Sequence, residues 1–525
     1  MATIYLNGRI HTMGQKDSIA QGMLVDNGVI AALGSADEVR SLAPRGTREV
    51  DLGSHVVVPG LTDSHTHFMM FSLGLNNVIL DVVPSLREAL SRVEAGARKR
   101  PKGSWVLGGG FNKNLWEGAR FPTRHDLDSV CPDHPVALRS SDYHTLWVNT
   151  LALRIAGITA STPVPDGGRI DAGPDGEPAG IIGENAMPLI EKHIPKPTEQ
   201  EMDEAAIEGM KLSNRYGLTG VHVMEGADSL RTFQRLLGRG LLTLRVSMYV
   251  PVDNLDDVAR LGIQSGFGGD MIRIAGIKTF TDGALNSQTA DMLEPFEGTD
   301  SRGIATLSEE ELDRIVGRAV QSGLAVAIHA IGDRANRKTL NALAKHQAAS
   351  RAKGLRNRIE HAQLLHPDEL PRFASTGTIA SVQPLHATSD RYVADRLWGK
   401  RAKYAYPFKS LITNGARVTF GSDAPVETID PMKGVYAAIT RKREDEPASR
   451  PWYPEEILSI QETVRGYTNG PAFASYREGT EGSLEPGKVA DFIVLSEDIF
   501  SGPPESVLRC RVLLNVVGGR VVYEA

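Results

Sequence analysis

The sequence has little cysteine, no long apolar run and no excess of positive charge. Its two cysteines, Cys131 and Cys510, do not make a disulfide framework in 525 residues and are typical of a reducing compartment. No stretch approaches the roughly 20 apolar residues of a membrane span. The opening residues, MATIYLNGRIHTMGQKDS, lack a basic region followed by an apolar core, so no secretory signal is expected. These absences predict a cytoplasmic protein with no membrane partner.

The charge balance also excludes a class of partner. The formal net charge is -6 and the pI is about 6.2, so the chain lacks the basic face that usually marks a nucleic-acid-binding protein. Hydrophobic residues make up 41% and charged residues 23%, which is typical of a globular chain long enough for more than one domain. No nucleic-acid partner is therefore expected.

Both ends of the chain read as short strands and turns. TIYLNGRIHTM, AQGMLVDNGVIAALGS and REVDLGSHVVVPG are apolar runs cut by Asn-Gly, Asn-Gly and Gly-Ser, and Asn-Gly between strands favours a hairpin. GSLEPGKVADFIVLSEDIF and VLLNVVGGRVVYEA have the same character near the other end. Because chain ends are often close in space, we expect residues 1–60 and 476–525 to build one small β-sandwich.

The middle, residues 61–475, alternates strands with helices. Eight strand-like runs occur, at 55–65, 217–224, 244–250, 272–280, 324–330, 356–362, 378–384 and 416–423. A helix is predicted at LSEEELDRIVGRAVQSG, where Ser308 and Glu311 have capping-box spacing and Gly323 marks the end. This α/β alternation predicts a (β/α)₈ TIM-like barrel.

One long insertion, about 75–216, follows the first predicted strand. Loops of this length normally have a function or a structure of their own. Since barrel active sites form at the carboxyl ends of the strands, we expect this insertion to be a lid that sets substrate choice. Its candidates for lining the pocket are Phe111, Trp116, Tyr143 and His144, although each aromatic could instead pack within the insertion itself.

Several polar side chains stand where the predicted strands end. In VVVPGLTDSHTHFMM, His65 and His67 are two residues apart and can point to the same side, as two imidazoles that share a metal ion would. A hydrogen-bonded pair of histidines is the alternative. The other candidates at comparable places are His222, Lys278, His329, His361 and Asp423.

Lys278 is unusual among imidazoles and carboxylates. An ammonium group repels cations, so its nitrogen contributes to a metal site only after reaction with CO₂ gives a carbamate. The alternative is a protonated lysine paired with a carboxylate such as Asp282.

The order His-x-His, Lys, His, His, Asp resembles the metal-dependent amidohydrolase superfamily. Longer phrases resemble its YtcJ-like (amidohydrolase 3) branch: GLTDSHTHF, FPTRHDLD, PDHPVALRS, WVNTLAL, KTFTDGALNSQTA, AIHAIGDRANR, RIEHAQ, GSDAPVE and GSLEPGKVADFIVL. The resemblance covers nearly the whole chain and implies a distorted TIM barrel with a composite β-sandwich. One departure is Asp142-Tyr143-His144, where relatives often have Asp-Gly-His.

The resemblance also implies roles for individual residues. His65, His67 and Asp423 would bind the more buried of two metal ions, and His329 and His361 the more exposed one. Lys278, as a carbamate, would bridge the two ions. Zn²⁺ is the expected ion, with Mn²⁺, Fe²⁺ or Co²⁺ as alternatives, and the superfamily suggests a homodimer.

The chemistry expected of such a site is hydrolysis of a C–N bond in a small non-peptide amide, formamide, N-acyl compound or cyclic amide. Metal-activated hydroxide would attack, with Asp423 as general base. His144 would stabilise the oxyanion or orient substrate, or else be a solvated loop residue. Asp333 is expected to orient a ligand histidine, while Asp282 and Glu427 either line the pocket or pair with cations. A mononuclear deaminase and a catalytically silent binding protein are the alternative functions.

Overall fold

Eight parallel strands form the central sheet of the protein, in a computed structural model that describes residues 2–81, 83–141 and 144–525. Every hydrogen-bonded neighbour pair in this sheet is parallel. In sheet order the strands are β8 (Leu61–Thr66), β15 (Leu218–Val223), β16 (Arg245–Pro251), β17 (Ile272–Phe280), β18 (Val326–Ala330), β19 (Arg358–His361), β20 (Ile379–Val382) and β21 (Arg417–Phe420).

The two edge strands of this sheet meet and close it into a barrel. Thr66 forms a parallel bridge with Ala424, which follows β21. The Asp423 N–H donates to the His65 carbonyl at 2.7 Å, and the His67 N–H donates to the Ala424 carbonyl at 2.9 Å. The predicted TIM-like barrel is therefore confirmed, and its closure brings β8 and the residues after β21 together.

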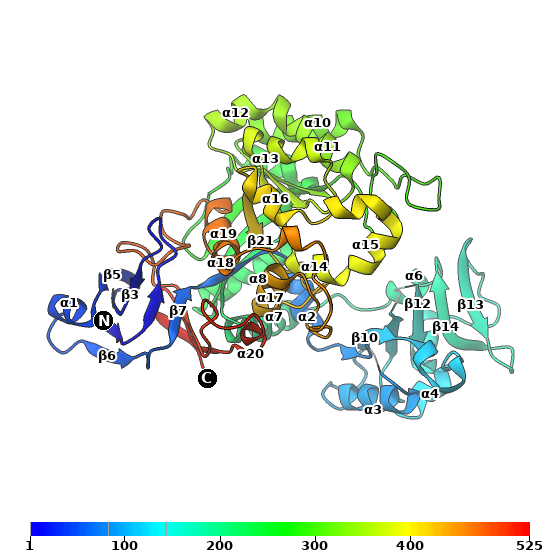
Figure 1. The fold of residues 1–525 in the computed structure, drawn as a ribbon. Helices are drawn as coiled ribbons and strands as arrows, with labels where there is room; N and C mark the ends of the chain where they lie inside the picture. Colours follow the sequence, from blue (N-terminus) through cyan, green and yellow to red (C-terminus); the bar gives the residue numbers. More distant parts are fainter. Residues whose placement is uncertain (1, 82, 142–143) are drawn as a thin grey trace. The chain divides into compact units, whose positions relative to one another are not determined.

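Helices alternate with the barrel strands along the chain (Figure 1). The main ones are α7 (Glu199–Arg215), α8 (Ala227–Gly238), α9 (Leu255–Arg260), α10 (Glu309–Gln321), α11 (Asp333–Lys345), α13 (Leu370–Thr376), α16 (Phe408–Thr413), α17 (Pro431–Thr440) and α18 (Ile460–Tyr467). The capping box of Ser308 and Glu311 that the sequence predicts starts α10, and the helix buries Leu312, Val316, Ala319 and Val320 at helical spacing. Within the described ranges, none of the helices combines the length and the apolar character that crossing a bilayer requires.

The first predicted barrel strand, 55–65, is two strands rather than one. β7 (Val56–Pro59) belongs to another sheet, and β8 starts at Leu61. Gly60 lies at the break, where a Cβ atom would come within 2.2 Å of the Thr219 side chain. A continuous apolar run hides this break because both strands are buried, so periodicity alone does not separate them.

Strands from both ends of the chain build two further sheets. One contains β5 (Val29–Gly34), β4 (Gly22–Asp26), β1 (Thr3–Leu6) and β6 (Arg48–Asp51). The other contains β24 (Arg520–Glu524), β23 (Val512–Val517), β22 (Phe492–Leu495), β7, β2 (Arg9–His11) and β3 (Ile19–Ala20). The pairing of β22 with β7 joins the two chain ends, whose blue and red strands lie side by side in Figure 1. A shared core with Tyr5, Val57 and Phe492 packs between these segments.

The two Asn-Gly turns behave differently. Asn27-Gly28 connects the antiparallel strands β4 and β5, as a hairpin turn should. Asn7-Gly8 lies between β1 and β2, which belong to different sheets, so the hairpin predicted there is wrong. The turn residues are the same, but burial of both flanking runs in separate sheets decides the second case.

Residues 72–205 form a compact unit of their own, unit 2, while residues 1–71 and 206–525 form unit 1. Unit 2 contains a six-stranded sheet in the order β13 (Gly168–Ala172), β14 (Pro178–Glu184), β12 (Thr145–Val148), β11 (Val136–Ser140), β10 (Val106–Phe111) and β9 (Val78–Ile79). Its helices include α3 (Leu86–Ala97), α4 (Arg124–Asp128) and α5 (Thr150–Ala156). Two apolar clusters pack within it, and its bounds of 72–205 differ from the 75–216 expected for the insertion.

Candidate active site

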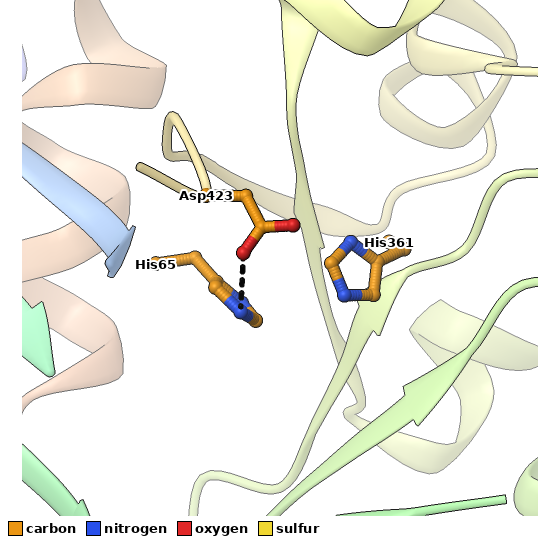
Figure 2. A group of neighbouring side chains, drawn as sticks. All are labelled: His65, His361 and Asp423. Atoms are coloured by element: carbon orange, nitrogen blue, oxygen red, sulfur yellow. Dashed lines mark ion pairs between the residues drawn. The ribbon is translucent and has the colours of Figure 1, made fainter. Parts of the chain in front are cut away.

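Polar side chains of unit 1 gather at the carboxyl ends of the barrel strands. His65 comes from β8, His361 from β19, and Asp423 from the segment after β21. Figure 2 shows these three side chains turned toward one another, and each offers a ligand atom within 4.8 Å of the other two. All three are buried, which favours a structural or catalytic role over solvation.

The backbone turns sharply at two of these residues. His361 has a φ of 73° and Asp423 a φ of 61°, a left-handed conformation that costs a non-glycine residue about 1–3 kcal/mol. At His361 the turn ends β19, and the imidazole ring lies 4.9 Å from the His65 ring and 4.6 Å from the His329 ring, centre to centre. Strain of this kind persists where the surrounding structure holds a functional geometry.

The two oxygens of Asp423 face different partners. Its Oδ1 lies 3.4 Å from Nε2 of His65 and 3.4 Å from Nε2 of His67, while its Oδ2 lies 3.9 Å from Nε2 of His386. Burial works to raise the pKa of Asp423, but the neighbouring histidines His65, His67 and His361 outweigh it and hold the pKa well below its ordinary value. The carboxylate is therefore an anion among imidazoles.

Lys278 projects from β17 into the same region. Its Nζ is buried without a hydrogen-bond partner among the described residues and lies 4.6 Å from the centre of the Phe280 ring. Burial lowers the pKa of Lys278 to about 8, against the opposing effects of Glu360 and Asp423. After burial, the charge of Lys278 is the largest influence that lowers the pKa of His65 to about 4 and of His329 to about 3.

The alternative partner considered for Lys278, Asp282, is occupied elsewhere. Its carboxylate accepts from the backbone N–H groups of Asp291, Ile331 and Gly332 at 2.8–3.3 Å. Burial raises its pKa to about 7 despite these bonds. Asp282 thus holds the loop after β17 against the end of β18, and the alternative, in which Lys278 pairs with Asp282, is not found among the described residues.

The donor set fits a divalent cation. Nε2 of His65, Nζ of Lys278 and Nε2 of His386 are buried and have no hydrogen-bond partner among the residues described. A buried polar atom without a partner costs about 1–3 kcal/mol, and the two imidazole nitrogens that face Asp423 are donors that a bound cation would satisfy. Imidazole nitrogen with carboxylate oxygen is the ligand chemistry of Zn²⁺ and related ions.

The remaining predicted ligands lie around this group. Nε2 of His67 faces Asp423, and the His67 ring lies 5.7 Å from the His65 ring. His329, from β18, donates from Nε2 to the carbonyl of Gly283 at 3.0 Å. His222, a further candidate from the sequence, is buried, and its Nδ1 accepts from Arg358 at 2.9 Å.

The aromatic candidates of the insertion pack inside unit 2. Phe111 and Trp116 are 1% and 5% exposed and share a core with Trp147, and the Trp116 ring N–H donates to the Val83 carbonyl at 3.0 Å. The prediction that these two residues line the pocket is wrong, because both side chains pack in this core. Tyr143 lies outside the described residues. His144 is exposed in unit 2, with Nδ1 3.0 Å from Oε2 of Glu184.

Two acidic candidates lie in other environments of unit 1. Asp333 starts α11 and accepts from the Leu293 N–H at 2.7 Å, so it holds a loop rather than a ligand histidine. Glu427 follows β21 and lines a surface pocket with Leu385, Lys433 and Arg443.

Sequence reasoning missed two residues of the site. His386, in α14 (Pro384–Ser389) directly after β20, stacks on His361 at 6.0 Å and faces Asp423. A search for polar residues a few positions beyond each predicted strand would have found it. Glu360 accepts from Nδ1 of His65 at 2.6 Å, but β19 has only the four residues Arg-Ile-Glu-His and is too short and too polar to show a periodic signal.

The protein can thus be described as a TIM-like barrel with a cluster of histidines and one aspartate at the carboxyl ends of its strands. Comparison with known proteins then identifies the family. The Amidohydrolase family model, Amidohydro_3, matches residues 48–523. The chain therefore belongs to the amidohydrolase family, as its motifs predict.

Individual relatives cover the whole chain. The putative amidohydrolase YtcJ of Bacillus subtilis is 33% identical over 100% of both chains. The N-substituted formamide deformylase of Arthrobacter pascens is 30% identical, over 99% of this chain and 98% of that one. Among solved structures, an uncharacterized metal-dependent hydrolase from Pyrococcus furiosus has a TM-score of 0.80 at 28% identity, over 95% of this chain and 100% of that one.

Proposed function

We propose that the protein hydrolyses a C–N bond in a small non-peptide substrate such as an N-substituted amide, a formamide or a cyclic amide. Membership of the amidohydrolase family supports hydrolysis, and similarity to an N-substituted formamide deformylase supports this substrate class. The observation that carries the proposal is the set of buried, unpartnered nitrogens of Lys278 and His65 beside Asp423.

These residues would hold divalent cations, with Zn²⁺ as the expected ion. His65, His67 and Asp423 would hold the more buried position, and His329 and His361 the other. Lys278, as a carbamate, would share both, and the lowered pKa of its amine favours the free base that reacts with CO₂. Such a centre supplies an activated water molecule and polarises the substrate carbonyl.

Asp423 is the proposed general base. Its Oδ1 faces the imidazoles of His65 and His67, which leaves Oδ2 toward the space beside His386. A carboxylate with one oxygen engaged by imidazoles can use the other to take a proton from water and return it to the leaving nitrogen.

Replacement of Lys278 by Ala tests the two-ion arrangement. We expect the variant to lose metal, measured by elemental analysis, and to lose amide hydrolysis, with partial recovery on addition of short-chain carboxylates. Lys338→Ala is the matched control, because Lys338 is mostly buried and pairs with Asp291 away from the ligands. Native metal content and activity in Lys278→Ala would contradict the arrangement.

A mononuclear deaminase is the second candidate, and one observation favours it. His65, His361 and Asp423 each offer a ligand atom within 4.8 Å of the other two, and three protein ligands are enough to hold a single catalytic Zn²⁺. This candidate predicts one equivalent of metal, an unmodified Lys278 by intact-protein mass spectrometry, and release of ammonia from aminated heterocycles. The first proposal predicts two equivalents and amine or carboxylate products from a panel of amides. Binding of these compounds without turnover would instead support the third alternative, a catalytically silent binding protein.

Unit 2 is proposed to set substrate choice. Its chemistry-bearing candidate is His144, which is exposed and hydrogen-bonded with Glu184. We expect His144→Ala to change the relative kcat/KM among amides and to leave metal content unchanged. An unaltered substrate profile would assign His144 a role only within unit 2.

A further inference from the structure

An ion pair is enclosed inside the barrel beneath the candidate metal ligands. Arg358 and Glu360 both come from β19, and the side chains of both are 0% exposed. Two residues apart on one strand, they point to the same face, and Arg358 donates from Nη2 to Oε2 of Glu360 at 2.9 Å and from Nε to Oε1. Burying two charges is costly unless their geometry and remaining hydrogen bonds are satisfied.

Arg358 satisfies that condition by contacts to four other barrel strands. The guanidinium also lies 4.7 Å from the centre of the Tyr249 ring. Its hydrogen-bond acceptors are the Ser64 carbonyl of β8 at 2.6 Å, Nδ1 of His222 in β15 at 2.9 Å, the Tyr249 hydroxyl of β16 at 3.2 Å, and the Ser381 hydroxyl of β20. The position of Glu360 is therefore set by the Arg358 guanidinium, which is itself held by hydrogen bonds to these four strands.

Glu360 uses its Oε2 for a third hydrogen bond, with Nδ1 of His65, at 2.6 Å. Because Arg358 keeps Glu360 an anion, the carboxylate can only accept, so Nδ1 of His65 must carry the hydrogen. The lone pair of His65 then lies on Nε2. That atom faces Asp423 at 3.4 Å and has no hydrogen-bond partner among the described residues.

We propose that Glu360, held by Arg358, is the positioning residue of the metal centre: it selects the tautomer and orientation of His65 that present Nε2 to the ion. The inference rests on the proposed function only in requiring that His65 binds a metal. It names a requirement beyond the ligand set, namely that affinity at the buried position depends on an ion pair that contacts neither metal nor substrate.

The variant Glu360→Gln tests the inference. The amide keeps the size of the side chain but can present its NH₂ group to His65 and pairs weakly with Arg358. Loss of the hydrogen-bond partner of a ligand histidine typically weakens metal binding 10–100-fold, so we expect the Zn²⁺ dissociation constant to rise by about that factor. The constant is measured by competition with a chromogenic chelator, and Co²⁺ absorption reports any change in ligand geometry.

Glu369→Gln is the matched control. Glu369 is also buried and pairs with two arginines, Arg337 and Arg372, but it contacts no ligand histidine. We expect it to lower the unfolding temperature of the metal-free protein while leaving Zn²⁺ affinity unchanged. Equal loss of affinity in both variants would assign the effect of Glu360 to general destabilisation and overturn the proposal.

Two further measurements test the inference if the Glu360→Gln variant does not fold. Glu360→Asp keeps the charge opposite Arg358 but withdraws the carboxylate from His65, and it should also bind Zn²⁺ more weakly. Neutron diffraction of the native protein should show deuterium on Nδ1 of His65, and deuterium on Nε2 would overturn the inference. Native protein that binds no Zn²⁺ refutes the proposed function, whereas native affinity in a folded Glu360 variant refutes this inference alone.

Discussion

Gly421→Ala should separate the metal ligands by adding a single methyl group. Gly421 directly follows β21, and a Cβ atom there would lie 2.5 Å from the backbone nitrogen of His65 and 2.9 Å from Oδ1 of Asp63. The first contact is about 1 Å shorter than ordinary van der Waals separation. Because the obstructing atom is backbone, rotation of a side chain cannot relieve it.

The expected cost follows from this geometry. Overpacking of this kind typically costs about 1–3 kcal/mol of folding free energy. The same displacement moves Asp423 relative to His65, because Asp63 accepts from the N–H groups of both His65 and Ser422, at 3.1 Å and 2.9 Å. A misplacement of about 1 Å at a reacting group can cost roughly 100-fold in rate.

Gly60→Ala supplies the comparison. Its Cβ would lie 2.2 Å from the Thr219 side chain at the amino-terminal end of β8, away from the ligands. We expect both variants to unfold at lower temperature, but only Gly421→Ala to lose bound metal and about 100-fold in kcat/KM. The reasoning would be refuted by a Gly421→Ala protein with native metal content and rate, or by an equal loss of activity in Gly60→Ala.

Three further predictions concern the metal and the thiols. The double variant His65→Ala/His67→Ala should lose the buried metal and nearly all hydrolysis, and unchanged stoichiometry by elemental analysis would overturn the ligand assignment. If the ion is normally present at about 100 times its dissociation constant, removing it with a chelator should destabilise the protein by about 3 kcal/mol. Calorimetry should then show a fall of a few degrees in Tm, and added Zn²⁺ should reverse it. Burial raises the pKa of Cys131 and of Cys510 to about 11, so iodoacetamide at pH 8.5 should alkylate both on the order of a hundredfold more slowly than a free thiol, and rapid labelling of native protein by mass spectrometry would contradict this.

Much of the barrel could be predicted from local pattern. β17 has the bounds 272–280 that its apolar run predicts, and α10 starts at the predicted capping box. These features depend on neighbours a few residues apart, which the sequence displays directly. The prediction of one strand at 55–65 was wrong for the opposite reason, since the sheet to which each half belongs depends on pairing with strands far away in the sequence, β22 for β7 and β15 for β8.

The candidate site divides in the same way. His65, His361 and Asp423 were found because each ends an apolar run, and in a parallel barrel all such ends meet at one face. Phe111 and Trp116 were misplaced because an aromatic residue in an insertion has the same local signature whether it lines a pocket or fills a core. His386 was overlooked because it lies in the first turn of a helix rather than at a strand end.

The family, the order of the barrel elements and the polar residues at their carboxyl ends can be read from the amino-acid sequence, because each depends on short-range pattern and motif. Which nitrogen of His65 faces the other candidate ligands cannot be read from it. That choice depends on Glu360, placed 295 residues later in the chain, and on the contacts by which Arg358 holds it. A tautomer is set by which groups meet across a closed barrel, and closure is a property of the folded chain alone.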